Sequence, residues 1–280
     1  MSGITQHLGR YTRRALFLAF LLIVLVFALF PLLWLLLTSF KNLRDAFVIP
    51  PKWFFQPTIE NYYQVFHTTR IQINMLNSVI IAGSATMLAL FLGAPGGYSL
   101  AQFEFRGKQQ LGFFILSIRI APPIMSLFPL YLIFNSIHII GSKLSLIIMY
   151  IVFNLPLAVW IMQIFFRDIP RELREAAVID GCSELGAFGR VVLPLAKSGL
   201  VATSILCLIQ SWNEYLFALV LSSRSSQTLP IAITAFRTYQ DTEWGPLTAA
   251  GVVVIIPMII FGLFVQKNLV RGMTLGAVKG

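Results

Sequence analysis

Long apolar runs separated by short polar segments make up most of this chain. The first run, 15–38, contains no charged side chain over 24 residues. A helix rises about 1.5 Å per residue, so this run reaches roughly 36 Å and is long enough to cross a bilayer. Because a helix satisfies its own backbone hydrogen bonds, the pattern predicts an all-α integral membrane protein with six transmembrane helices in one domain, 1–280. The other five spans are predicted at about 76–101, 111–134, 144–166, 199–222 and 248–265.

A cleaved signal peptide is the alternative interpretation of the first run, because Arg10, Arg13 and Arg14 precede it. The apolar region of such a peptide is shorter, and no small-x-small cleavage site follows this one. We therefore expect an uncleaved membrane anchor.

The composition agrees with a membrane protein. Hydrophobic residues make up 57% of the chain and charged residues 11%, against about 45–50% and about 25% in soluble domains. The net charge of +10 could indicate nucleic-acid binding, but the positive residues are spread through the segments between apolar runs, as in membrane proteins. The two Cys and three His residues lie far apart in the sequence, so neither a metal site nor a disulfide framework is expected.

The distribution of Lys and Arg predicts the orientation. With six spans, both termini lie on the same side of the membrane. That side carries 13 Lys and Arg residues, and the opposite side carries seven. The positive-inside rule therefore places both termini and the loop 167–198 in the cytoplasm. The stretch 39–75 is then external, and we expect it to be partly folded.

The loop 167–198 is long enough for two short helices. In the first, Leu173, Ala176 and Ala177 fall on one face by the i, i+3, i+4 rule, and charged residues occupy the remainder. Gly181 is expected to end this helix, because glycine readily adopts the left-handed conformation of a helix cap.

A second helix is predicted to follow in the same loop. Ser183 is suited to cap it, the helix runs to about Val191, and Pro194 ends the segment before the fifth span. The expected product is a helix–Gly–helix projection whose small-residue knob is framed by charges. Such a shape is suited to docking into a groove on a cytoplasmic partner.

The residues of this loop resemble the EAA loop of ABC importer permeases. The family pattern is E-A-A, three residues, G, nine residues, I, one residue and L-P. The chain keeps every spacing and departs only by Val in place of Ile at the I position. The matching residues are Glu175, Ala176, Ala177, Gly181, Val191, Leu193 and Pro194.

The resemblance covers most of the chain and is closest to the smaller permease of carbohydrate importers, the maltose-transporter type. The motifs that carry it are Ile169-Pro170, Asp180-Gly181, Trp212-Asn213-Glu214 and the closing Gly272-Met273-Thr274-Leu275-Gly276-Ala277-Val278-Lys279-Gly280.

This resemblance implies a permease subunit of an ATP-driven type I carbohydrate importer, embedded in the lipid of the bacterial inner membrane. The implied protein partners are a second permease, a dimer of ATPase subunits and an extracytoplasmic sugar-binding protein. No G-x-x-x-x-G-K-[ST] loop occurs in the chain, so ATP and Mg are expected on the ATPase. We therefore expect no catalytic residue and no cofactor in this chain.

The resemblance also implies that the first helix of the loop is a coupling helix seated in a cleft of the ATPase. The tail 272–280 is implied to reach the ATPase dimer near the nucleotides, and a frayed terminus is the alternative. The residues implied to couple to the ATPase are Glu175, Ala176, Ala177, Asp180, Gly181, Leu193 and Pro194.

Polar residues inside the predicted spans are candidates for the translocation path. Glu214 lies about fifteen residues into the fifth span, where an ionisable group is costly and usually faces a cavity or a partner helix. With Trp212, Asn213 and Tyr215 it is suited to hold a sugar through aromatic faces and polar hydrogen bonds. The alternative is a structural hydrogen bond within or between the two permeases.

Arg119 is a second polar candidate, about eight residues into the third span and before Pro122-Pro123. The two prolines are expected to break the helix and to free backbone carbonyls. Arg119 is then expected to bond to those carbonyls, to extend to the inner interface, or to face the cavity.

Three other functions stay open at this point. The first is an ABC permease for a non-sugar solute, which the carboxy-terminal motif disfavours. The second is a proton-coupled carrier with Glu214 and Arg119 as the coupling pair. The third is a membrane-embedded enzyme, which the absence of a Ser/His/Asp group or a His cluster argues against.

Overall fold

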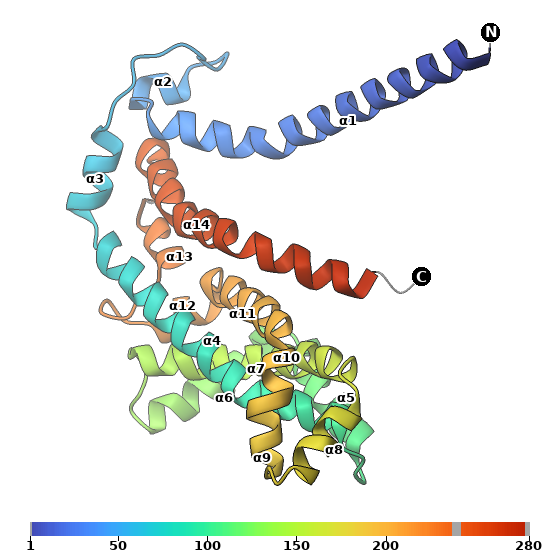
Figure 1. Cartoon of the computed structure of the whole chain (residues 1–280). Helices are drawn as coiled ribbons and strands as arrows, with labels where there is room; N and C mark the ends of the chain where they lie inside the picture. The colour runs from blue at the N-terminus through green and yellow to red at the C-terminus, as the bar shows by residue number, and fades with distance from the viewer. Residues whose placement is uncertain (1, 237–241, 278–280) are drawn as a thin grey trace. The chain divides into compact units, whose positions relative to one another are not determined.

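The computed structural model describes residues 2–236 and 242–277, with side chains for 13–236 and 242–263. The described residues form helices and connecting segments, with an isolated bridge between Gly141 and Ser222 and no named strand (Figure 1). The prediction of an all-α protein is confirmed. The helices are α1 Ser2–Ser39, α2 Leu43–Phe47, α3 Glu60–Thr68, α4 Ile71–Gln102, α5 Lys108–Ile120, α6 Pro123–Ser136, α7 Lys143–Arg167, α8 Arg171–Ile179, α9 Glu184–Ala187, η1 Phe188–Val192, α10 Leu193–Leu195, α11 Lys197–Trp212, α12 Leu216–Leu221, α13 Leu229–Ala232, η2 Ile233–Phe236 and α14 Trp244–Ala277.

Four described helices are long and apolar enough to cross a membrane, and two bent helix pairs bring the number up to six. One bent pair is α5 with α6, at an angle of 92°, and the other joins Glu184–Leu195 to α11 at 79°. The fifth span differs from its prediction at 199–222, because α11 ends at Trp212 and α12 begins only at Leu216. No proline or glycine marks this interruption in the sequence.

The contacts divide the chain into two compact units, 1–69 with 235–253 and 70–234 with 254–280. In the first unit, the buried side-chain amide of Asn61 donates to the carbonyls of Ser39 and Lys41 at 2.8 Å each. These two bonds tie α3 to the end of α1. The predicted external stretch is therefore partly helical, as expected, and α4 begins at Ile71 inside the range assigned to it.

In the second unit, α4 and α7 lie side by side and form its central helix pair (Figure 1). Two glycines of α4 allow the close approach. A β-carbon at Gly93 would lie 2.6 Å from the β-carbon of Ala158, and one at Gly97 would lie 2.7 Å from the carbonyl oxygen of Val159. Small residues four positions apart are typical of closely packed membrane helices. The pair is thus held by backbone-to-backbone contact that a larger residue would disrupt.

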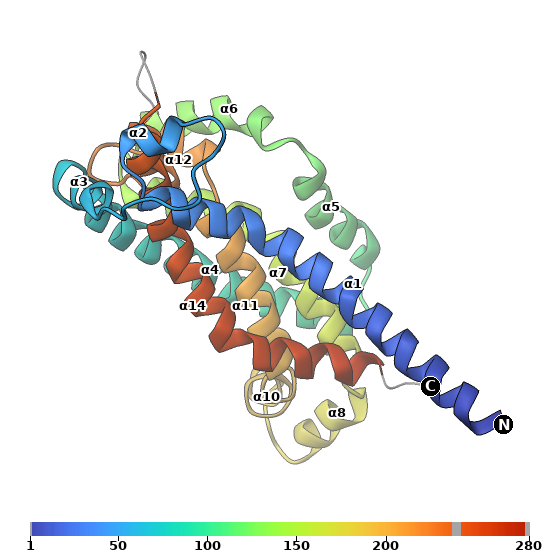
Figure 2. The same ribbon diagram turned by 90° about the horizontal axis from the view of Figure 1, so that it is seen from above.

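The break predicted at Pro122-Pro123 is present. Helix α5 ends at Ile120, Pro123 begins α6, and Figure 2 shows the bend between the two helices. Proline cannot donate to the preceding turn, so two successive prolines end α5 and start a new helix in another direction.

An aromatic cluster joins the end of the α4–α7 pair to the segment that follows α7. The cluster consists of Tyr98, Phe103, Phe166 and Phe188, with ring centroids 4.7 to 5.9 Å apart in its contacting pairs. Phe188 belongs to η1, so this cluster seats the loop segment on the ends of the two helices. The segment is a packed part of the second unit.

Candidate functional site

The first candidate site is the projection formed by α8, α9 and η1. Helix α8 ends at Ile179, and Gly181 has φ of +90°. The Gly181 N–H donates to the carbonyl of Val178, and the Cys182 N–H donates to the carbonyl of Ala177, both at 3.0 Å. This pair of bonds is the left-handed helix stop that the sequence predicts at Gly181.

The second helix of the projection is shorter than expected. The Ser183 hydroxyl accepts a hydrogen bond from the Gly186 N–H at 3.1 Å, so the predicted cap is confirmed. The α-helix then ends at Ala187, and a π-helical turn, Phe188–Val192, replaces the predicted run to Val191. Wider turns of this kind are frequent at functional positions.

The predicted face of Leu173, Ala176 and Ala177 is divided. Ala177 is buried at 7% exposure, whereas Ala176 and Leu173 are exposed. The three residues share one helix face, as their spacing predicts, but the burial of Ala177 shows that part of this face packs inside the second unit. Only Ala176 therefore remains as the small-residue knob.

Charged and apolar side chains surround this knob. Glu175 is exposed, and its carboxylate lies 3.7 Å from the guanidinium of Arg174. The same guanidinium lies 4.7 Å from the centroid of the Phe103 ring. Ile179 and Leu185 are 85% and 82% exposed at the tip. Large apolar side chains so exposed next to a rigid turn are typical of a surface that another protein covers. Three predicted coupling residues remain: Asp180 is the C-cap of α8 and donates its N–H to the carbonyl of Ala176 at 2.9 Å, and Leu193 and Pro194 lie in α10 at the base of the projection.

The second candidate site is a cavity of about 170 Å³ in the second unit, and Glu214 contributes to it. One carboxylate oxygen of Glu214 accepts from the Phe217 N–H at 2.9 Å and the other from the Ala218 N–H at 3.1 Å. Glu214 is thus a cap of α12 in the interruption, not a residue of a continuous helix as predicted. The residues lining the cavity are Pro123, Tyr150, Phe153, Asn154, Gln210, Ser211, Glu214, Leu216 and Phe217.

Two buried polar groups in the cavity lining were missed in the sequence analysis. The Asn154 side-chain oxygen is buried without a hydrogen-bond partner among the described residues, and the Tyr150 hydroxyl lies beside the Glu214 carboxylate. The Asn154 amide donates to the Ser211 hydroxyl at 2.7 Å. Tyr and Asn four residues apart lie on one helix face, and this spacing within the apolar run 144–166 was the available signal. Buried unsatisfied polar groups are costly unless a water or a ligand reaches them.

The structure separates the other predicted path residues from this cavity. Trp212 is buried outside the lining, and Asn213 is exposed and donates to the carbonyl of Ile209. Tyr215 is 40% exposed. Only Glu214 of the predicted motif lines the cavity.

Arg119 has a different partner from the one expected. Its guanidinium donates to the carbonyl of Phe153 at 3.4 Å, which belongs to α7. This carbonyl is not one of those freed by Pro122-Pro123, which was one of the three alternatives expected for Arg119. Since Phe153 lines the cavity, Arg119 reaches the edge of this site through that residue.

Comparison with known proteins now adds to this geometry. Residues 86–275 match the family described as "Binding-protein-dependent transport system inner membrane component". The chain belongs to this permease family. Its members are non-catalytic membrane subunits of ABC transporters, and the prediction that the chain is not an enzyme is confirmed.

Similar proteins match this permease over nearly its whole length. A probable ABC transporter permease protein of Sinorhizobium fredii, y4oR, is 36% identical, with 99% of this chain and 100% of the relative covered. The trehalose transport system permease protein SugB of Mycobacterium tuberculosis is 38% identical, with 96% and 99% covered.

A solved structure supports the fold of this permease. It is a chain from the crystal structure of a bacterial ABC transporter involved in the import of the acidic polysaccharide alginate. The two chains superpose with a TM-score of 0.77 at 21% identity, covering 92% of this chain and 97% of the other. The predicted importer-permease fold is therefore confirmed.

Proposed function

We propose that this permease is one of two membrane subunits of an ATP-driven carbohydrate importer and that it couples transport to ATP hydrolysis on a separate ATPase dimer. The observation that carries the proposal is the α8 projection, in which a short helix ends at a left-handed glycine and leaves Glu175 and Ala176 exposed. ATP and Mg then bind to the ATPase, since the chain has no phosphate-binding loop.

Docking of the projection would bury the apolar tip of Ile179 and Leu185 in a groove of the ATPase. When ATP closes the ATPase dimer, the two projections of the permease pair move together. The aromatic cluster seats η1 on the α4–α7 pair, α8 contacts η1, and Arg174 of α8 lies over the Phe103 ring. A displacement of α8 therefore moves these helices as one body. A rigid-body switch of this kind opens the path to the other side of the membrane.

The carbohydrate specificity rests on two supports. One is the resemblance to the smaller permease of the maltose-transporter type, and the other is the similarity to a trehalose permease. The cavity beside Glu214 has suitable chemistry, because its carboxylate, amide and hydroxyl groups pair with sugar hydroxyls. Its volume of about 170 Å³ admits one part of a sugar or a few waters. An extracytoplasmic binding protein delivers the solute.

Uptake by cells that lack this chain tests the proposal. We expect deletion of the chain to abolish ATP-dependent uptake of at least one of radiolabelled trehalose, maltose and diacetylchitobiose, and re-expression to restore it. Uptake that collapses with a protonophore while ATP is maintained would instead identify the proton-coupled carrier. Unchanged uptake of all three sugars, with loss of growth on a non-sugar solute, would identify the non-sugar permease.

The proposed orientation gives a separate prediction. In a variant with both native cysteines replaced by Ala, we expect Gln56→Cys to react with an impermeant maleimide in intact spheroplasts and Ser183→Cys to react only after the membrane is opened. Both positions are exposed in this chain, so once the ATPase has been stripped from the opened membranes, access to each is limited by the membrane alone. Labelling of Ser183→Cys from outside would contradict cytoplasmic termini and the docking role of α8.

A further inference from the structure

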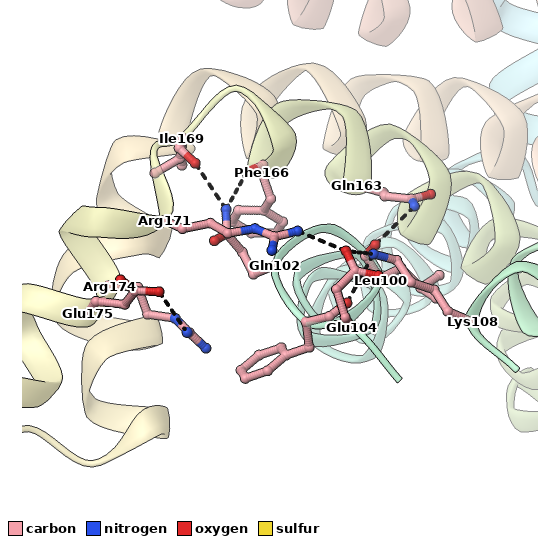
Figure 3. Close-up of polar contacts among 11 residues, drawn as sticks. Leu100, Gln102, Glu104, Lys108, Gln163, Phe166, Ile169, Arg171, Arg174 and Glu175 are labelled. Carbon is pink, nitrogen blue, oxygen red and sulfur yellow. Dashed lines mark hydrogen bonds and ion pairs between the residues drawn. The ribbon is translucent and has the colours of Figure 1, made fainter. Parts of the chain in front are cut away.

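Gln102, the last residue of α4, lies at the corner between α7 and the coupling helix α8. It is 4% exposed, and its side-chain amide donates to the carbonyl of Phe166 at 2.8 Å and to that of Ile169 at 3.0 Å (Figure 3). Phe166 is in the last turn of α7, and Ile169 directly precedes the proline before α8. The Phe166 carbonyl also accepts from the Ile169 N–H at 3.3 Å, so Gln102 bonds to both ends of this backbone turn. One side chain thus fixes both sides of the corner.

Glu104 makes a second tie, two residues further along the chain. Its carboxylate accepts from Arg171, in the first turn of α8, at 2.9 Å and from Lys108, in the first turn of α5, at 3.0 Å (Figure 3). These hydrogen bonds hold the pKa of Glu104 below its usual range, and the bond from Arg171 has the larger effect. The ion pairs therefore persist at neutral pH and are lost only as the pH falls through that lowered pKa.

Packing of α4 against α7 does not account for Gln102. The glycine contacts already hold the two helices together, and Gln163 of α7 makes the converse tie by donating to the carbonyl of Leu100 at 3.2 Å. The side-chain oxygen of Gln102 is also buried without a partner in the described residues. An apolar residue would avoid that cost, so the two donated bonds are the feature that distinguishes this position.

We propose that Gln102 is a positioning residue for energy coupling, which transmits the displacement of α8 to the α4–α7 pair, and that Glu104 extends the same tie to α5. This inference rests on the proposed function. Through Gln102 the coupling helix cannot tilt without moving the end of α4. Through Glu104 the same displacement reaches the bent α5–α6 pair.

The test is Gln102→Met in the complete importer, reconstituted in proteoliposomes with its ATPase and binding protein. Met keeps the length of the side chain and removes both donors. We expect ATPase co-purification and basal ATP hydrolysis to stay within twofold of the parent, while transport of the sugar identified by uptake falls at least tenfold. The sugar moved per ATP hydrolysed should fall at least fivefold.

Gln163→Met is the matched control, since it removes an amide-to-carbonyl bond between the same two helices away from the corner. We expect it to stay within twofold of the parent in every measurement. Equal losses in both variants would show a packing role and would overturn the inference, as would full coupling in Gln102→Met. Loss of ATPase binding in Gln102→Met alone would also overturn it, because the residue would then serve docking.

The charge pair gives an independent arm that does not disturb the core, because Glu104 and Arg171 are exposed. We expect Glu104→Arg to lower the sugar moved per ATP at least threefold, and the added Arg171→Glu to restore at least half of the loss. If Glu104→Arg has no effect, or if the added Arg171→Glu restores no coupling, then Glu104 does not contribute to transmitting the displacement of α8. If the parent complex shows no ATP-dependent uptake, the proposed function itself is refuted. If the parent is active and its Gln102→Met variant is fully coupled, only the inference about Gln102 is refuted.

Discussion

Gly181→Asp should weaken association with the ATPase about five- to thirtyfold and reduce transport in proportion. Gly181 has φ of +90°, and a residue with a β-carbon adopts this conformation at a cost of about 1–2 kcal/mol. A β-carbon at this position meets no atom within 4 Å, so the packing inside the permease is unaffected. The helix stop is then displaced, and Ala176 and Glu175 no longer face the groove of the ATPase. Co-purification of the ATPase with the membrane complex, measured beside sugar uptake, checks the result.

Gly189→Asp is the control for this prediction. Gly189 lies in the regular π-helical turn of the same projection, is exposed, and has no atom within 4 Å of a β-carbon. The control therefore adds the same charge to the same segment without the left-handed strain. We expect docking and transport within twofold of the parent. Equal loss in both variants would assign the effect to charge, and retention of docking in Gly181→Asp would refute the coupling role of the turn.

Glu214→Leu should abolish transport, whereas Glu214→Gln should retain at least one fifth of it. The carboxylate accepts from two backbone N–H groups at the start of α12, and Gln keeps one acceptor oxygen for them. Leu leaves both N–H groups in the protein interior without that partner, at a cost of about 1–3 kcal/mol per group. We also expect Leu to lower the melting temperature of the purified complex. Uptake and thermal unfolding of both variants provide the measurement.

Asn213→Ala controls for changes at the interruption between α11 and α12. Asn213 is the neighbour of Glu214 and is exposed, and its side-chain amide donates to the carbonyl of Ile209 in the preceding turn. We expect it to leave uptake and unfolding nearly unchanged. Complete loss in both Glu214 variants, together with proton uptake by the parent during transport, would favour a proton-coupled carrier over the capping role.

Features that depend on local chemistry could be predicted from the order of the residues. Apolar runs long enough to cross a bilayer predicted the helical membrane fold, and adjacent prolines predicted the break between α5 and α6. Gly181 predicted the left-handed stop of the first helix in the loop. Each of these follows from a few neighbouring residues, because helix length, proline geometry and glycine conformation hardly depend on the rest of the chain.

Local sequence patterns did not predict which side of a helix faces the protein interior. The i, i+3, i+4 rule groups Ala176 with Ala177 on one face, but it does not say against what that face packs. Packing inside the second unit, where α8 contacts both η1 and α9, buries Ala177 and leaves Ala176 exposed. The interruption at Glu214 was equally hidden, since an acidic residue within an apolar run has no intrinsic tendency strong enough to end a helix.

Only the tertiary structure brought together residues far apart along the chain. The carbonyls that Gln102 holds lie 64 and 67 positions further on, and Asn154 meets Ser211 across 57 positions. Sequence periodicity reports the faces of single helices, whereas these contacts depend on how α4, α7 and α11 cross. The crossing is set by the glycines that admit Ala158 and Val159, and the polar partners follow from it. The membrane fold and the helix stop at Gly181 were therefore determined locally, and the lining of the cavity and the corner at Gln102 were determined by packing.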